Sequence, residues 1–161
     1  MKIGFIGLGT MGSEASLNIL RGGHELNVCD LDKTRAERHI GMGATWANTP
    51  AEATKGADIV FTMVFGPEQI DHVVRGPGGI LETIRDGQIW IDMTTNSPEM
   101  SAILADAVAA KGAIAIDAPV TGAVDGARNA NMTQFAGGDE AAVEKARPVM
   151  ELMVPLPFAP M

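Results

Sequence analysis

Three glycines near the amino terminus have the spacing that binds the pyrophosphate of a nucleotide. The pattern Gly-x-Gly-x-x-Gly is formed by Gly7, Leu8, Gly9, Thr10, Met11 and Gly12. In such a loop the first glycine permits a tight turn, the second lets the backbone approach the phosphates, and the third lets a helix pack closely on the sheet. Free N–H groups at the helix start then bind the anion. A generic glycine turn is the alternative, but the motif follows an apolar run and precedes a helical pattern, which favours nucleotide binding.

A carboxylate follows at the distance expected of a ribose-binding residue. Asp30 ends the second predicted strand, 23 residues after Gly7. It would accept hydrogen bonds from ribose hydroxyls and repel a 2′-phosphate, which predicts NAD as the cofactor. Leu31 stands where an NADP site more naturally has arginine, while Lys33 and Arg35 keep NADP as the alternative. A solvated aspartate that only begins a turn is less favoured, because the acid and the glycine motif occur together.

The elements that must position these residues follow from the hydrophobic pattern. Short apolar runs alternate with stretches of helical period, which indicates β-α units and a parallel sheet. Strands are expected at residues 2–6, 25–30, 57–64, 88–92, 113–117 and 132–137. Helices are expected at residues 11–22, 33–42, 67–74, 79–85, 98–111 and 139–153, with the fifth capped by Ser97 and started by Pro98. The predicted fold class is α/β, a Rossmann-type doubly wound, mostly parallel sheet.

Two other classes of nucleotide-binding protein use a similar loop. S-adenosylmethionine-dependent methyltransferases usually have an acidic residue just before the glycines, where this chain has Ile6, and they lack a packing glycine such as Gly12. FAD-binding enzymes share the motif but normally need more than 161 residues. Both are therefore less favoured than a nicotinamide dinucleotide.

Composition and charge fit one globular domain and exclude some partners. The 161 residues are 46% hydrophobic and 20% charged, which is typical of a folded chain. With 12 basic and 20 acidic side chains the net charge is -8, which disfavours nucleic acid and anionic membranes as partners. Glu14 and the early glycines interrupt the apolar start, so a signal peptide is not expected. The single cysteine, Cys29, fits a reducing compartment, and a cytoplasmic location is predicted.

Residues 92–98 and 117–123 carry two further patterns. The first is Asp-Met-Thr-Thr-Asn-Ser-Pro and the second is Asp-Ala-Pro-Val-Thr-Gly-Ala. Together with residues 1–30, they resemble the β-hydroxyacid dehydrogenase family of the 3-hydroxyisobutyrate dehydrogenase and tartronate semialdehyde reductase type. The corresponding family segments are Asp-Met-Ser-Thr/Ser-x-x-Pro and Asp-Ala-Pro-Val-Ser-Gly-Gly. The resemblance covers residues 1 to about 153.

The resemblance implies further contacts with the cofactor. The glycine motif would hold the pyrophosphate and Asp30 the ribose. Val64 and Phe65 would lie along the cofactor, although the family usually has proline where Phe65 stands. Thr95 would contact the cofactor near its nicotinamide end.

The resemblance also implies a place for the substrate carboxylate. Thr121, Gly122 and Ala123 would hold it through a hydroxyl and backbone N–H groups. Thr121 replaces the usual serine, and the methyl group of Ala123 replaces a glycine and would narrow the substrate range. From the residues alone, a polar turn is an equally good interpretation. Asp117 is predicted to be a buried loop-capping aspartate and not a base.

The family's catalytic lysine lies on a long helix after the nucleotide domain, which the resemblance puts beyond Met161. No catalytic residue is therefore assigned within the chain, and no metal-ligand spacing occurs. His24, His39 and His72 are predicted to be surface or helix residues.

The expected organisation is a dinucleotide-binding domain over residues 1–153 and a proline-rich tail over residues 154–161, without the family's helical second domain. By family, the function is hydride transfer between a nicotinamide cofactor and a small 3-hydroxy acid or semialdehyde. We expect negligible turnover by the chain alone, because hydride transfer needs enclosed, closely placed reactants. A non-catalytic dinucleotide-binding module, or one subunit of a split enzyme, is the alternative.

The closing helix and the tail carry apolar side chains that a second domain would normally cover. They are Val143, Ala146, Val149, Met150, Met153, Val154, Leu156 and Phe158. We expect this surface to be exposed and to drive association, which predicts a homo-oligomer.

Overall fold

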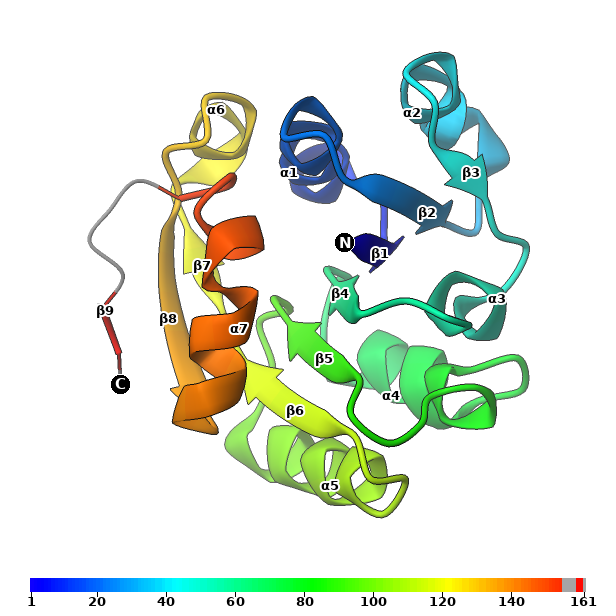
Figure 1. Cartoon of the computed structure of the whole chain (residues 1–161), viewed down its shortest axis with the longest axis vertical. Coiled ribbons are helices and arrows are strands. Elements are labelled where there is room, and N and C mark those ends of the chain that lie inside the picture. The colour runs from blue at the N-terminus through cyan, green and yellow to red at the C-terminus, as the bar shows by residue number, and fades with distance from the viewer. Residues whose placement is uncertain (155–158, 161) are drawn as a thin grey trace.

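The computed structural model describes residues 1–154 and the backbone of residues 159–160, and this part of the chain is built around one sheet (Figure 1). Within these residues the strands are β1 Lys2–Ile6, β2 Glu25–Cys29, β3 Thr45–Trp46, β4 Ile59–Thr62, β5 Ile89–Asp92, β6 Ile114–Asp117, β7 Val120–Thr121, β8 Thr133–Gly138 and β9 Ala159–Pro160. Their order is β3-β2-β1-β4-β5-β6-β8-β7, with β9 paired to β8. The α/β fold expected from the sequence is confirmed.

The six strands from β3 to β6 in this order are all parallel. The order runs outward from β1 on one side and from β4 on the other, so the connection changes direction between these two strands. Such a switch point opens a crevice at the carboxyl ends of the strands, where doubly wound folds bind ligands. The antiparallel strands β8 and β7 extend the sheet beyond β6.

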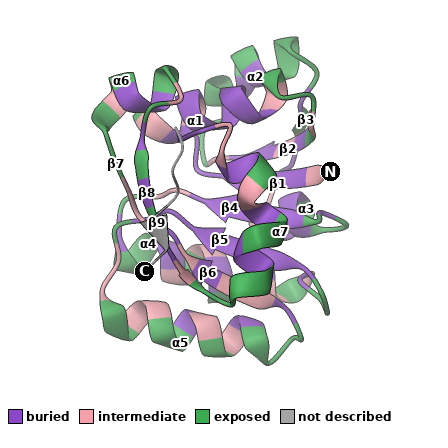
Figure 2. Ribbon diagram, turned by 60° about the vertical axis from the view of Figure 1, so that its left-hand side comes forward, coloured by how far each residue is buried: buried purple, intermediate pink, exposed green. Residues whose placement is uncertain are grey.

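Helices cover both faces of the sheet. They are α1 Thr10–Arg21, α2 Glu37–Gly41, α3 Pro50–Thr54, α4 Pro67–Arg75, α5 Pro98–Ala109, α6 Ala123–Arg128 and α7 Glu140–Met150. Figure 1 shows α3, α4 and α5 along one face and α1 and α7 on the other, and each face has its own apolar core. The central strands β4 and β5 are buried along their whole length (Figure 2), which explains their continuous apolar runs.

Helix starts follow the expected side-chain caps. The Ser97 hydroxyl accepts a hydrogen bond from the Met100 N–H, and Pro98 occupies the first turn of α5, as predicted. The same signal occurs at Thr49, whose hydroxyl accepts from the Glu52 N–H at the start of α3. Helix α3 was not predicted, because five residues are too few to show helical periodicity.

Several expected elements differ from the structure. The helix expected at 33–42 is a 3-10 turn, Lys33–Ala36, followed by the short α2. The helix expected at 79–85 is only a 3-10 turn, Ile80–Glu82. The short elements β3, β7 and α6 were not predicted at all. In each case the segment is too short for its pattern to identify it.

The expected exposure of the closing helix is wrong. Side chains of α7 and of the turn after it pack into the core shared with α1, because the helix lies on the sheet face and turns its apolar side inward. Six of the residues expected to be exposed are at most 7% exposed: Val143, Ala146, Val149, Met150, Met153 and Val154. Leu156 and Phe158 lie outside the described residues. The exposed apolar surface from which a homo-oligomer was predicted is therefore not found among the described residues of this helix.

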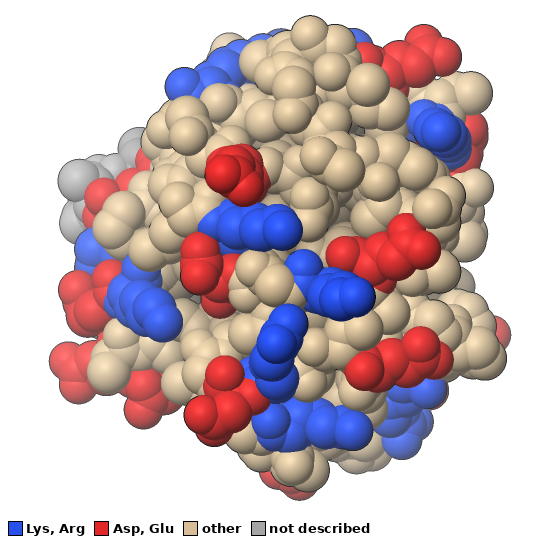
Figure 3. Space-filling model, turned by 45° about the vertical axis from the view of Figure 1, so that its right-hand side comes forward, with Lys and Arg blue, Asp and Glu red and all other residues tan. Residues whose placement is uncertain are grey.

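The surface carries charges of both signs. On the face drawn in Figure 3, Lys and Arg side chains are interleaved with Asp and Glu and do not form one basic patch. In the part of the chain that the structure describes, no helix has the length and apolar character needed to cross a bilayer.

Candidate functional site

The glycine loop between β1 and α1 leaves room for a ligand at one position only. A Cβ atom added at Gly7, which has φ +100°, would lie 2.1 Å from the Met63 carbonyl oxygen. A Cβ atom at Gly12 would lie 2.1 Å from the carbonyl oxygen of Gly7. The Cβ direction of Gly9 instead meets no atom within 4 Å. Gly7 and Gly12 are thus needed for the turn and its packing, whereas Gly9 borders open space.

The amino end of α1 can receive an anion. Gly9 is the residue before the helix, and none of the described side chains caps this end or places an acid in its first turn. Thr10 is exposed and Met11 half-buried, so their backbones border solvent. Leu8 differs, because its side chain is 2% exposed and packs in the core. The loop therefore offers backbone N–H groups and the helix dipole to a pyrophosphate.

Asp30 is joined directly to the glycine loop. One carboxylate oxygen accepts a hydrogen bond from the Leu8 N–H at 2.7 Å, and the other accepts from the Asp32 N–H at 2.9 Å. Its side chain is 10% exposed, and the guanidinium of Arg35 lies 3.9 Å from it. Asp30 does begin a turn, but it is not the solvated side chain of the simpler interpretation. Each oxygen keeps a lone pair that a ribose hydroxyl can use.

The loops after β4 and β5 are tied to each other. The Val64 N–H donates a hydrogen bond to the Thr94 hydroxyl at 3.1 Å. Beyond these two residues, Phe65 is 89% exposed and Thr95 is exposed. The structure therefore presents two of the predicted cofactor contacts at the surface and holds the loops beneath them together.

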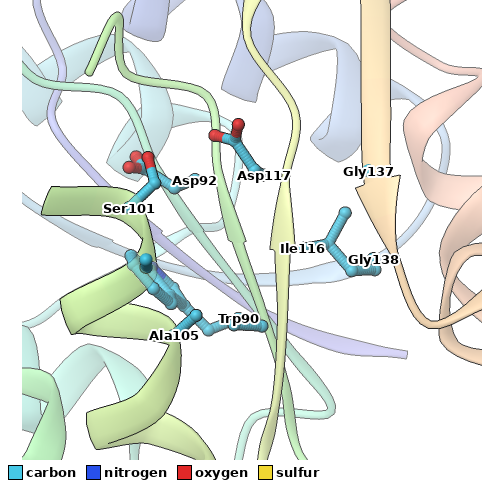
Figure 4. A pocket seen from close by; sticks show the side chains of 10 residues that line it. Trp90, Asp92, Ser101, Ala105, Ile116, Asp117, Gly137 and Gly138 are labelled. Atoms are coloured by element: carbon cyan, nitrogen blue, oxygen red, sulfur yellow. The ribbon is translucent and has the colours of Figure 1, made fainter. Parts of the chain in front are cut away.

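Carboxyl groups lie side by side at the ends of β5 and β6, a pairing that was not predicted from the sequence. Asp117 was predicted to be a buried loop-capping residue, but it is half-buried, and among the described residues no hydrogen bond ends on its carboxyl group. Asp92 and Asp117 are partners in register on these neighbouring strands, and both line a cavity of about 230 Å³ with Trp90 and Ser101 (Figure 4). Burial raises the pKa of Asp92 to about 6 and also raises the pKa of Asp117. The available signal was an acidic residue that ends an otherwise apolar strand.

The predicted substrate segment lies at the start of α6. Thr121, Gly122 and Ala123 are exposed, with φ of +130° at Gly122 and +52° at Ala123. The helix that follows packs on α1, where the Asn18 amide donates to the Ala127 carbonyl at 2.8 Å. Among the described residues, no hydrogen bond joins this segment to the glycine loop or to Thr95.

His39 is a buried helix residue. It lies between α2 and α1, with its Nε2 atom 2.8 Å from the Ser16 hydroxyl oxygen, and burial lowers its pKa. His72 is exposed on α4, and His24 lies half-buried in the turn before β2. His39 thus packs one helix on another, while the expectation of a surface or helix position is met by all three.

The fold and the site together define a dinucleotide-binding domain. The sheet has a switch point between β1 and β4, the start of α1 behind the glycine turn is uncapped, and an acid follows β2. Residues 2–155 match the family described as the NAD binding domain of 6-phosphogluconate dehydrogenase. The chain belongs to this family, and the residues of the loop fit the cofactor that its description names.

Relatives of known name are about twice as long as this chain. A 2-hydroxy-3-oxopropionate reductase of Escherichia coli strain K12 is 36% identical over 153 residues, which are 95% of this chain and 52% of the relative. The structure of Mycobacterium tuberculosis 3-hydroxyisobutyrate dehydrogenase with L-serine has a TM-score of 0.90 at 32% identity, covering 98% of this chain and 53% of that one. Psf3 in complex with NADP+ and 2-OPP has a TM-score of 0.91 at 30% identity, covering 98% and 56%.

Proposed function

We propose that this chain is the cofactor-binding part of an oxidoreductase that transfers hydride between a nicotinamide dinucleotide and a small 3-hydroxy acid or its semialdehyde. The observation that carries the proposal is the open space at Gly9, in front of an uncapped helix and beside an acid that is bonded to the same loop. Names of the relatives support the substrate class, since two of them act on such compounds by name. When bound, the nicotinamide ring would supply or accept the hydride.

The residues of the chain take separate roles in this proposal. The loop from Gly7 to Gly12 binds the pyrophosphate through the N–H groups that remain free, since those of Gly7 and Leu8 already donate to the Cys29 carbonyl and to Asp30. Asp30 accepts hydrogen bonds from the adenosine ribose. Exposed Phe65, with Val64 beneath it, lies along the cofactor, and Thr95 contacts its nicotinamide end. The exposed segment 121–123 offers a hydroxyl and N–H groups to the substrate carboxylate.

NAD is the proposed cofactor, with NADP as the alternative. A 2′-phosphate would be placed near the Asp30 carboxylate, which repels it. Arg35 is the nearest cation, but it already lies 3.9 Å from both Asp30 and Asp32. Leu31 is fully exposed and offers no charge. The NADP+ complex of one relative is the reason for measuring both cofactors.

The proposed organisation is a dinucleotide-binding domain over residues 1–153 and a tail over residues 154–161. We expect negligible turnover by this chain alone, because its site lies at an open edge and does not enclose the reactants. A non-catalytic module or one subunit of a split enzyme is the alternative; a separate helical chain with a catalytic lysine would favour the split enzyme. A reducing, cytoplasmic location fits the buried free thiol of Cys29. Whether the chain forms a homo-oligomer is decided by its mass in solution.

The test is a fluorescence titration of the purified chain with NADH and, in parallel, with NADPH. Saturable binding that favours NADH is expected. The variant Gly9→Val places its Cβ atom where no described atom lies within 4 Å, so it should fold normally and lose at least about 2 kcal/mol of binding free energy. Gly41→Val is the matched control, because Gly41 also faces open space but lies on α2.

Two results would count against this function. One is wild-type protein that binds neither nucleotide at millimolar concentration. The other is a Gly9→Val variant that binds NADH as well as the Gly41→Val variant does, since the pyrophosphate would then lie elsewhere.

A further inference from the structure

A chain of buried hydrogen bonds runs across the carboxyl ends of β4 and β5. The Trp90 indole N–H donates to the Thr62 hydroxyl at 3.0 Å, and this hydroxyl donates to Asp92 Oδ1 at 2.9 Å. The same oxygen accepts from the Thr94 N–H at 3.0 Å, and the Thr94 hydroxyl accepts from the Val64 N–H at 3.1 Å. The side chains of Trp90, Thr62, Asp92 and Thr94 are at most 3% exposed.

Asp92 lies at the centre of these hydrogen bonds. An apolar side chain at this position would avoid the free-energy cost of burying a carboxyl group. Asp92 Oδ2 is buried and has no hydrogen-bond partner among the described residues. Asp92 lines a cavity together with Asp117 of β6, whose negative charge also raises the pKa of Asp92 (Figure 4). The other polar side chains near Asp92, Thr62 from β4 and Ser101 from α5, are uncharged. Burial of an incompletely paired carboxyl group destabilises a fold. The carboxyl group fixes the Thr94 peptide N–H after β5 and the Thr62 hydroxyl at the end of β4, and the Thr94 hydroxyl in turn holds the Val64 N–H.

The two halves of the proposed cofactor site depend on different contacts. The glycine loop and Asp30, which would hold the adenosine diphosphate half, are joined by their own hydrogen bond and, among the described residues, share no hydrogen bond with Asp92 or Thr94. The loops that carry Val64 and Thr95, which would line the nicotinamide half, are joined by the Thr94 hydroxyl, and Asp92 holds the Thr94 N–H in place. A change at Asp92 should therefore act on one half only.

We propose that Asp92 is a positioning residue that fixes the backbones at Val64 and Thr94 and so shapes the part of the groove that receives the nicotinamide half of the dinucleotide. The inference rests on the proposed function for the identity of the ligand. Asp92 acts through the two loops and contacts no reacting atom. Its effect is a preference of the site for the whole dinucleotide over its adenosine diphosphate fragment.

The experiment compares the dissociation constants of NADH and of ADP for the purified chain. In Asp92→Ala the Thr94 N–H and the Thr62 hydroxyl lose their acceptor, and Thr94 is no longer fixed against the Val64 N–H. The Kd for NADH should therefore rise about tenfold while the Kd for ADP changes less than about twofold. Asp92→Asn keeps an acceptor oxygen and should restore NADH binding to within about threefold of wild type. If Asp92 served stability alone, Asp92→Ala would raise the Kd values of NADH and ADP by the same factor, and Asp92→Asn would not restore NADH binding selectively.

A matched pair of smaller changes covers the case in which Asp92→Ala fails to fold. Thr62→Val removes one hydroxyl that donates to Asp92, and Thr54→Val removes an equally buried hydroxyl that donates to the Pro50 carbonyl on α3. Only Thr62→Val should weaken NADH binding, by about threefold, with ADP binding unchanged.

The outcomes separate this inference from the proposed function. Wild-type protein that binds neither NADH nor ADP refutes the cofactor site, and this inference with it. Wild-type protein that binds both, with equal losses for both ligands in Asp92→Ala or Thr62→Val, overturns only the role of Asp92. Unchanged NADH binding in Thr62→Val, or an equal loss in Thr54→Val, overturns it as well.

Discussion

The two edges of the parallel sheet are built differently. At the amino edge, each turn that leads into β2, β3, β4, β5 or β6 contains a glycine with positive φ, and these are Gly23, Gly43, Gly56, Gly87 and Gly112. Beyond the carboxyl end of β6, two alanines take the same backbone region, with φ of +52° at Ala123 and +53° at Ala130. Glycine adopts this region freely, whereas alanine is strained there.

Buried polar groups at the two ends of β5 show the same contrast. Gln88, just before the strand, donates to the carbonyls of Thr54 and Ala57 and accepts from the Arg85 N–H. Asp92, at the other end, leaves one oxygen unpaired. The amino edge is thus satisfied and relaxed, while the carboxyl edge keeps unpaired and strained groups. Departures of this kind concentrate where a fold binds its ligand, because the arrangement there is not chosen for stability.

The sharpest test of the contrast removes the satisfied group. Gln88→Ala removes three hydrogen bonds to the backbone and leaves the Ala57 carbonyl and the Arg85 N–H without this partner, while the Thr54 carbonyl still accepts from the Ala57 N–H. The free energy of unfolding should fall by about 4 kcal/mol. Urea denaturation measures this loss. Because Gln88 lies at the edge away from the proposed site, NADH affinity of the folded variant should equal that of wild type. Unchanged stability of the variant would show that the hydrogen bonds of Gln88 do not stabilise the amino edge of the sheet.

At Asp92, in contrast to Gln88, the buried ionised group is expected to lower the free energy of unfolding. The pKa of its carboxyl group is about 6 in the folded protein against an ordinary 3.8, so the folded state binds the proton more tightly than the unfolded state. This contribution to stability is complete below about pH 4 and is lost as the pH rises through 6. The shift of about two pKa units corresponds to about 3 kcal/mol.

Asp92→Asn carries no titrating group and should therefore be more stable than wild type at pH 8 and about equal to it at pH 4. Urea denaturation of both proteins at the two pH values measures the difference, which cancels the contributions of all other titrating groups. A difference that does not change with pH would mean that the Asp92 carboxyl group is not destabilised by burial.

The smallest effect is expected at the strained alanines. Ala123→Gly relieves the positive φ at the start of α6 and should raise the free energy of unfolding by up to about 1 kcal/mol. Ala130→Gly, at the other end of this helix, provides the comparison. If the methyl group of Ala123 also narrows the proposed substrate site, only Ala123→Gly should widen the range of carboxylates that bind. Thermal unfolding separates the two effects, since stability should rise in both variants.

The sequence predicted the parts of the molecule that repeat a local rule. Strands β1, β2, β4, β5 and β6 each form an apolar run long enough to identify, and the glycine pattern located the turn before α1. The direction in which a helix turns its apolar side depends on the packing of the whole chain, which is why α7 was predicted to be exposed. The hydrogen bonds that link the ends of β4 and β5 join residues 28 to 30 positions apart, and no local pattern carries such information.

The hydrogen bond between Asp30 and the Leu8 N–H has a consequence for redesign of cofactor preference. Replacing the acid to admit a 2′-phosphate would also release the backbone of the pyrophosphate loop. An attempt to exchange one nicotinamide cofactor for the other by Asp30→Ala would therefore weaken both. Asp30→Asn, which can keep an oxygen on the Leu8 N–H while discarding the charge, is the substitution from which an engineered change of preference should start.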